Sequence, residues 1–224
     1  MNTTTWKTTD ELITAMNRVY GHMSLAVITS MIVSWLVSSS PVLMQFFFTG
    51  IMQYIVIFAP LVAIFAISFN MHKVSYSTAQ MMLHGFAALM GLSFATIFVV
   101  YTGMSIITAF LGAAILFLTM SIYGYVTKKD LTSIGQFMFV GLIAIIIASI
   151  VNIFIGSTVM QMAISAIAII VFMGLTAYDT QKIRQIVSQG GDTRSQEVAG
   201  ALTLYLDFIN LFIALLQLFG NRRD

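Results

Sequence analysis

The chain has 224 residues, of which 59% are hydrophobic and 8% are charged, and its mean hydropathy is +0.96. Soluble domains carry about 25% charged residues, so this composition excludes an ordinary cytosolic enzyme, a disordered chain and a nucleic-acid binder. The net charge is +2 and Cys is absent, which excludes disulfides, thiolate metal sites and a Cys nucleophile. The composition is typical of a helical protein that crosses a membrane several times.

Three long stretches of the chain carry no charged residue. Residues 1–18 are polar and lack a cleavable signal sequence, so we expect a short N-terminal segment followed by a retained first span. The uncharged stretches that follow are 19–72, 74–127 and 131–178. One helical crossing takes about 20 apolar residues. Each stretch therefore accommodates two crossings joined by a tight turn.

Turn-forming residues near the middle of each stretch divide it into a helical hairpin. They are Ser38-Ser39-Ser40-Pro41, Tyr101-Thr102-Gly103 and Gly156-Ser157-Thr158. A seventh apolar segment follows a polar loop at 183–198. We expect an all-α membrane protein with one seven-helix transmembrane domain over 19–220 and a short tail at 221–224. The predicted helices cover residues 20–39, 49–70, 78–101, 104–126, 134–156, 159–180 and 199–219.

Lys and Arg residues gather on one side of this predicted topology. Eight lie on the side of the N-terminus, and two, Arg222 and Arg223, lie in the tail. Because cytoplasmic loops are enriched in Lys and Arg, we expect a cytoplasmic N-terminus and, after seven full crossings, an external C-terminus. The Arg pair in the tail favours the alternative of a re-entrant seventh segment. The eight residues are Lys7, Arg18, Lys73, Lys128, Lys129, Lys182, Arg184 and Arg194.

Pro60 and His84 are unusual residues in the first two hairpins. Pro60 lies in the middle of the second predicted helix, where its missing N–H frees a carbonyl group. We interpret it as a packing kink, with a gating or ligand role as the alternative. His84, in the third predicted helix, is expected to be packed and hydrogen-bonded. In the alternative interpretation it lies within reach of an ion-binding cavity.

Two charged residues lie within the predicted spans. Asp179 is near the cytoplasmic end of the sixth helix, and Asp207 is about eight residues into the seventh. Charged groups at membrane depth are costly and are candidates for function by default. Because the two helices run in opposite directions, both carboxyl groups fall in the cytoplasmic half, where they can face each other. Such a pair shares a proton and responds to pH, or to a hard cation such as Ca²⁺ that replaces the proton.

Polar residues near the two aspartates either add a ligand to this ion-binding site or offer a purely structural role for the aspartates. Asn210 follows the second aspartate on the same helical face and can add a carbonyl oxygen to the site. Lys182 lies one turn after the first aspartate and can neutralise it. In the alternative interpretation, each aspartate only caps a helix or bonds a nearby hydroxyl group, such as that of Thr176.

The segments around the two aspartates resemble the Bax inhibitor-1 family, in particular its bacterial inner-membrane branch. The first segment is Gly174-Leu-Thr-Ala-Tyr-Asp-Thr-Gln-Lys-Ile183, and the second is Gly200-Ala-Leu-Thr-Leu-Tyr-Leu-Asp-Phe-Ile-Asn-Leu-Phe212. The resemblance runs from about residue 17 to residue 223. It implies seven helices, with the seventh central and wrapped by the other six. It also implies a pH-sensitive Ca²⁺ leak in which Asp179 and Asp207 sense protons and Ca²⁺.

The chain departs from this family in one respect. Some members place a basic residue in the second helix near the aspartate pair and an acidic one in the second or third. Here stretches 19–72 and 74–127 contain neither. A partner for the pair would therefore be a neutral residue, such as His84, or Lys182.

Two further functions remain open at this point, a proton-coupled cation exchanger and an intramembrane aspartyl protease. Tyr178-Asp179 and Asp207 resemble the presenilin-type arrangement, but Leu204-Tyr205-Leu206 replaces the Gly-x-Gly that precedes the second Asp of that family. We expect no enzyme activity and no cofactor, with Ca²⁺ and H⁺ as transported or regulatory ions. The expected partner is the lipid bilayer of a bacterial inner membrane. We infer no nucleic acid and no protein partner, and we expect a monomer.

Overall fold

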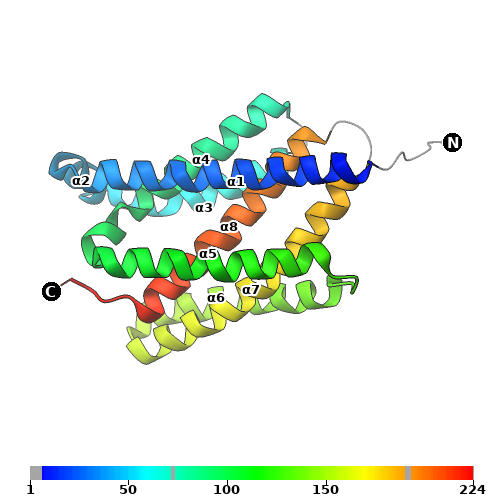
Figure 1. Ribbon diagram of the computed structural model, residues 1–224. Coiled ribbons are helices and arrows are strands. Elements are labelled where there is room, and N and C mark those ends of the chain that lie inside the picture. The colour runs from blue at the N-terminus through cyan, green and yellow to red at the C-terminus, as the bar shows by residue number, and fades with distance from the viewer. Residues whose placement is uncertain (1–6, 72–73, 190–192, 224) are drawn as a thin grey trace. The chain divides into compact units, whose positions relative to one another are not determined.

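The computed structural model describes residues 7–71, 74–189 and 193–223, which form eight α-helices (Figure 1). Residues 1–6 of the predicted N-terminal segment, Lys73, residues 190–192 of the predicted loop and residue 224 of the tail lie outside the described residues. The helices are α1 (Thr9–Ser38), α2 (Pro41–Phe48), α3 (Met52–Asn70), α4 (Tyr76–Val100), α5 (Gly103–Val126), α6 (Thr132–Ile155), α7 (Thr158–Ser188) and α8 (Arg194–Phe219).

Three helices are longer than the sequence predicts. Helix α1 begins at Thr9 instead of residue 20, α7 ends at Ser188 instead of residue 180, and α8 begins at Arg194 instead of residue 199. The predicted loop at 183–198 is therefore wrong, because most of it is helical. Apolar residues mark the part of a helix that suits a membrane, but backbone bonds and caps decide where the helix ends. At α1 the side chains of Thr8 and Glu11 form a reciprocal capping box.

The second predicted helix also differs from the structure, because it is preceded by a separate short helix. Helices α2 and α3 meet at an angle of 76° and together satisfy the length and hydropathy expected of one membrane span. Ser40 caps α2 by accepting a hydrogen bond from the N–H of Leu43, and Pro41 occupies the first turn. Within the described ranges, six single helices are long and apolar enough to cross a membrane, and the bent pair raises that number to as many as seven. The chain is thus an all-helical membrane protein, whereas its hairpin arrangement stays a prediction.

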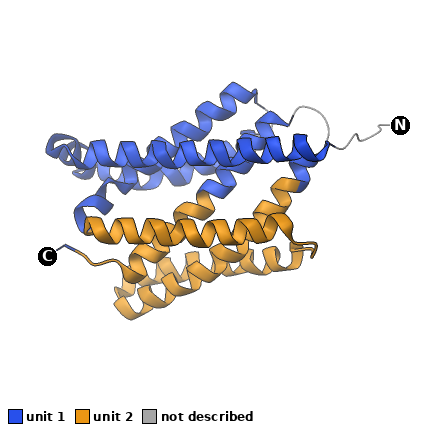
Figure 2. Ribbon diagram, viewed as in Figure 1, with its two compact units in different colours: residues 1–100, 185–205, 223 blue, residues 101–184, 206–222, 224 orange. Residues whose placement is uncertain are grey.

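The chain divides into two compact units (Figure 2). Unit 1 comprises residues 1–100, 185–205 and 223, and so contains α1 to α4 and the first half of α8. Within it, α1 and α3 both pack on α4. A Cβ atom at Gly91 of α4 would lie 2.5 Å from the carbonyl oxygen of Ser30 on α1, so only glycine permits this crossing. The buried Ser30 hydroxyl bonds both the carbonyl oxygen of Ala87 and the hydroxyl of Tyr205, each at 2.7 Å.

Pro60 leaves the carbonyl oxygen of Val56, one turn earlier in α3, without its usual helical partner. The hydroxyl group of Ser93 on α4 donates a hydrogen bond to this oxygen at 2.7 Å. Val56 and Pro60 are both buried, and a buried carbonyl without a partner is costly. The proline therefore serves packing in this structure, because it creates an acceptor that ties α3 to α4.

Unit 2 comprises residues 101–184, 206–222 and 224, and so contains α5, α6, most of α7 and the second half of α8. Phe110 and Phe117 of α5 make edge-to-face ring contacts with Phe208 of α8. After α8 ends, the carbonyl oxygen of Asn221 accepts a hydrogen bond from the N–H of Thr102, in the turn between α4 and α5. The tail therefore returns to the turn that precedes α5.

The candidate spans differ strongly in how much of each one is buried. In α8, 67% of the most apolar 18-residue window is buried, whereas the figure for α6 is 6%. After Gln136, the exposed side chains of α6 are all aliphatic or aromatic, as expected for a surface in contact with lipid. High burial is expected for the central last helix that the family resemblance implies.

Candidate functional site

Helices α7 and α8 bring the two aspartates together within unit 2. Asp179 is half-buried and lies about two turns before the end of α7. Asp207 lies in the middle of α8 and is only 4% exposed. The two carboxyl groups lie within hydrogen-bonding reach of each other. A hydrogen bond between two carboxyl groups requires that one of them hold a proton.

The surroundings of Asp207 are apolar on the side of α5. Phe208, the next residue, packs against the rings of Phe110 and Phe117. Oδ2 of Asp207 is buried and has no hydrogen-bond partner among the described residues. Where the structure describes the chain, both ion pairs are made by Glu197 and neither by Asp207. An unpaired carboxylate in such surroundings is costly, so the site favours a shared proton or a bound cation.

Two glycines allow neighbouring helices to approach α7 next to Asp179. A Cβ atom at Gly124 of α5 would collide with the carbonyl oxygen of Ala177. A Cβ atom at Gly135 of α6 would collide with the ring of Tyr178. Helices α5 and α6 thus enclose the turn of α7 that carries the aspartate.

The last part of α7 is fixed by side-chain bonds to the end of α5 and to the α5–α6 turn. Gln181 donates to the carbonyl oxygen of Lys129 at 2.8 Å and accepts from the N–H of Leu131 at 2.9 Å. Arg184 donates to the carbonyl oxygen of Tyr125 at 2.8 Å and lies over the ring of the same residue. These bonds hold in place the part of α7 that follows Asp179.

The predicted accessory residues Thr176, Asn210 and Lys182 each have a contact within their own helix. The Thr176 hydroxyl donates to the carbonyl oxygen of Phe172 at 2.7 Å, and the Asn210 amide donates to the carbonyl oxygen of Leu206 at 2.8 Å. Both bonds are made within their own helices. Lys182 is exposed, with its ammonium 5.6 Å from the centre of the Tyr178 ring, and its charge acts on Asp179.

His84 lies in unit 1. Its Nδ1 atom is 3.1 Å from the hydroxyl oxygen of Thr29 on α1. The side chain is half-buried between α1 and α4. This placement is that of a packed, hydrogen-bonded histidine.

Sequence reasoning missed a buried ion pair in unit 1. The carboxylate of Glu197 is 0% exposed, and Arg18 of α1 donates to both of its oxygens, at 2.6 and 2.8 Å. The sequence places Glu197 in a loop and Arg18 in a polar N-terminal segment, so neither residue is a candidate there. A signal was nevertheless present, because Arg18 lies in helical register with Ala15 and His22, which are both buried.

A family model described as "Inhibitor of apoptosis-promoting Bax1" matches residues 13–224. The chain is 41% identical to the inner membrane protein YbhL of Escherichia coli K12, over 95% of this chain and 93% of that protein. It is 42% identical to an uncharacterized protein of Rickettsia prowazekii, over 97% of this chain and 94% of the relative. An uncharacterized protein of Borreliella burgdorferi is 37% identical, with 92% and 91% coverage. None of these three names describes a catalytic activity.

Proposed function

The chain belongs to the Bax inhibitor-1 family of membrane proteins, and we propose that it is a passive leak pathway for Ca²⁺ whose opening is controlled by a proton shared between Asp179 and Asp207. Ca²⁺ is the cargo and H⁺ the regulator, and no cofactor takes part. We place the protein in a bacterial inner membrane, the location that the name of its Escherichia coli relative states, with the N-terminus in the cytoplasm.

The burial of Asp207 is the observation that carries this proposal. Its carboxyl group is 4% exposed, faces Asp179 and has one oxygen without a partner among the described residues. A group that only stabilised the fold would be expected to have its hydrogen bonds satisfied. Here the pair has a carboxyl oxygen that can still accept one proton or coordinate one cation. A pH-controlled ion site needs this property.

The chemistry of the pair gives the direction of the pH response. With a proton between the two oxygens, the carboxyl groups attract each other and Asp207 is enclosed, which is the closed arrangement. Loss of the proton leaves two adjacent negative charges that repel each other strongly in apolar surroundings. Ca²⁺ takes six to eight oxygen ligands, of which two carboxylates supply at most four. Water supplies the others, so the ion is held weakly enough to leave.

Ca²⁺ flux into proteoliposomes at pH 6, 7 and 8 tests the proposal. Flux through the wild type is expected to rise at least roughly threefold from pH 6 to pH 8, because deprotonation opens the pair. Asp207→Asn and Asp179→Asn are each expected to remove this pH dependence. Equal pH dependence in the wild type and in both variants would contradict the proposal, and so would the absence of Ca²⁺ flux at every pH.

Asp130→Asn is the matched control for these two variants. Asp130 is an exposed carboxylate in the α5–α6 turn of the same unit. Hydrogen bonds from the hydroxyl group and then the N–H of Thr132 hold the pKa of Asp130 below its usual value. It is therefore ionised throughout pH 6–8, and its substitution should leave the pH profile of flux unchanged.

The same vesicles separate a passive leak from a proton-coupled exchanger. At fixed pH on both sides, a leak follows the Ca²⁺ gradient alone. An exchanger would also accumulate Ca²⁺ against its gradient when a proton gradient is imposed. We expect no such accumulation, and its appearance would assign the aspartate pair to exchange.

A further inference from the structure

The carboxylate of Glu197 is fully enclosed, although it lies in the first turn of α8. Arg18 donates from Nε to Oε2 at 2.6 Å and from Nη2 to Oε1 at 2.8 Å, which is the strong bidentate geometry. The Thr193 hydroxyl donates to Oε1 at 3.2 Å, and the Lys7 ammonium lies 3.9 Å from the same oxygen. We call Lys7, Arg18, Thr193 and Glu197 the clasp. It joins α1 to α8 within unit 1.

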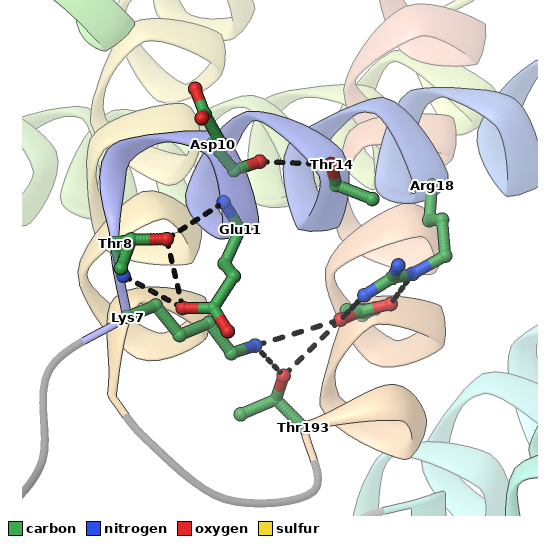
Figure 3. A network of polar contacts seen from close by, with 8 residues as sticks. Lys7, Thr8, Asp10, Glu11, Thr14, Arg18 and Thr193 are labelled. Carbon is green, nitrogen blue, oxygen red and sulfur yellow. Dashed lines mark hydrogen bonds and ion pairs between the residues drawn. The ribbon is translucent and has the colours of Figure 1, made fainter.

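Lys7, which lies two residues before α1, makes further bonds beside those of Glu197. Figure 3 shows the side chain of Lys7 extending towards Thr193, while Arg18 approaches from farther along α1. The N–H of Lys7 also donates to the carbonyl oxygen of Ser188, the last residue of α7, at 3.0 Å. Lys7 is thus bonded both to the last residue of α7 and to Thr193, the residue before α8.

Water reaches one side of the clasp. A cavity of about 450 Å³ is lined by Lys7, Asp10, Glu11, Thr14, Arg18, Thr193, Arg194 and Glu197. The Arg18 side chain is 40% exposed, while the Glu197 side chain is 0% exposed. The arginine can therefore leave its partner without unpacking an apolar core. Departure would leave a buried, poorly paired carboxylate, which is strongly unfavourable, so the intact clasp favours one position of α8.

Helix α8 connects the clasp to the aspartate pair. Glu197 and Asp207 are ten residues apart on one continuous helix, Arg194–Phe219, which corresponds to about 15 Å along its axis. A helix transmits a displacement of one half to the other half. A shift of the first turn of α8 away from α1 would consequently move Asp207 relative to Asp179.

We propose that Arg18 and Glu197 are positioning residues for the ion pathway, because their buried pair holds α8 in the position that keeps the aspartate pair closed. This inference rests on the proposed function. It assigns to the clasp the role of opposing opening, so weakening the clasp should raise Ca²⁺ flux and locking it should lower the flux.

The first test weakens the clasp while preserving its shape. Arg18→Gln/Glu197→Gln removes both charges together and leaves side chains that can still bond each other. In proteoliposomes at pH 7, this double variant should conduct Ca²⁺ at least threefold faster than the wild type, with the rise of its pH profile shifted to lower pH. Asp10→Asn, which removes a carboxylate that lines the same cavity, should leave flux unchanged. A folded double variant with wild-type flux and pH profile would overturn the inference.

The second test ties the start of α1, and with it Arg18, to the end of α7, so that Arg18 stays beside Glu197. The chain has no cysteine, so Lys7→Cys/Ser188→Cys introduces one defined pair at two residues whose backbones are hydrogen-bonded. Oxidation should lower flux at pH 8 at least threefold, and a reductant should restore it in the same vesicles. General destabilisation would not produce a reversible loss. Flux that is unchanged when the cross-link has formed would overturn the inference.

Failure of the two proposals can be told apart. If wild-type flux is absent or independent of the aspartates, the proposed function fails. The clasp is then judged by cross-linking alone, without any flux measurement. The disulfide of the Lys7→Cys/Ser188→Cys variant should form at least fivefold more slowly when Glu197→Gln is added, because Arg18 then no longer anchors the start of α1 to α8. Equal rates would show that the Arg18–Glu197 pair does not hold α1 in place, and would overturn the inference.

Discussion

Gly124 and Gly112 lie on the same helix, α5, but differ in what a side chain would meet. A Cβ atom at Gly124 collides with the backbone of Ala177, two residues before Asp179, whereas one at Gly112 lies 3.5 Å from a methyl group of Leu215. We expect Gly124→Ala to lower the free energy of unfolding by about 1–3 kcal/mol, because α5 must move away from α7.

Gly112→Ala is the matched control for this substitution. It should leave stability unchanged or raise it by up to about 1 kcal/mol, because alanine favours helix formation. Thermal unfolding of both variants in the same detergent measures the difference. A Gly124→Ala variant as stable as Gly112→Ala would show that the close approach of α5 to Ala177 is not needed.

Among single residues, the burial of Asp207 could be predicted from the sequence, whereas the burial of Glu197 could not. Asp207 interrupts a long apolar run, so its burial follows from the helix that contains it. Glu197 stands among polar residues and looks like part of a solvated loop. Its burial depends on Arg18, which is 179 positions away in the sequence, and local patterns do not reveal such a pairing. The contact between Asp179 and Asp207 could be expected from the opposite directions of their helices.

At the scale of helices, the pairing of Pro60 with Ser93 makes a double-mutant prediction. Ser93→Ala should lower the free energy of unfolding by about 1–3 kcal/mol, because the carbonyl oxygen of Val56 loses its donor in a buried position. In a Pro60→Ala background the loss should be much smaller, since the restored N–H of residue 60 can bond the same oxygen. Equal losses in the two backgrounds, measured by unfolding in one detergent, would refute this account.

Hydropathy locates the apolar spans, whereas capping side chains and turn residues decide where the helices end or break. The predicted starts and ends of the third to fifth helices, 78–101, 104–126 and 134–156, agree with α4, α5 and α6 to within two residues. The extension of α1 back to Thr9 relies on a cap outside the apolar stretch. The bend between α2 and α3 falls at Thr49-Gly50, where Gly50 has a positive φ of 61°, so a turn residue and not hydropathy marks the change of direction.

At the scale of the whole molecule, the last prediction concerns the sides of the membrane. In unit 2 the N–H of Thr102 bonds the carbonyl oxygen of Asn221, so the tail and the α4–α5 turn must share one side. Lys128 follows α5, a span of 24 residues, and should lie on the opposite side. Single cysteines can report this directly because the native chain has none.

Met104→Cys and Arg223→Cys should therefore react alike with a membrane-impermeant maleimide added to right-side-out vesicles. Lys128→Cys should react only after the vesicles are opened, because the excess of Lys and Arg on its side marks the cytoplasm. Thr158→Cys, at the first residue of α7, should react like Met104→Cys and serves as an internal control. Reaction of Arg223→Cys only in opened vesicles would mean that α8 does not cross the membrane. The tail would then lie in the cytoplasm, as the re-entrant alternative for the seventh span predicts.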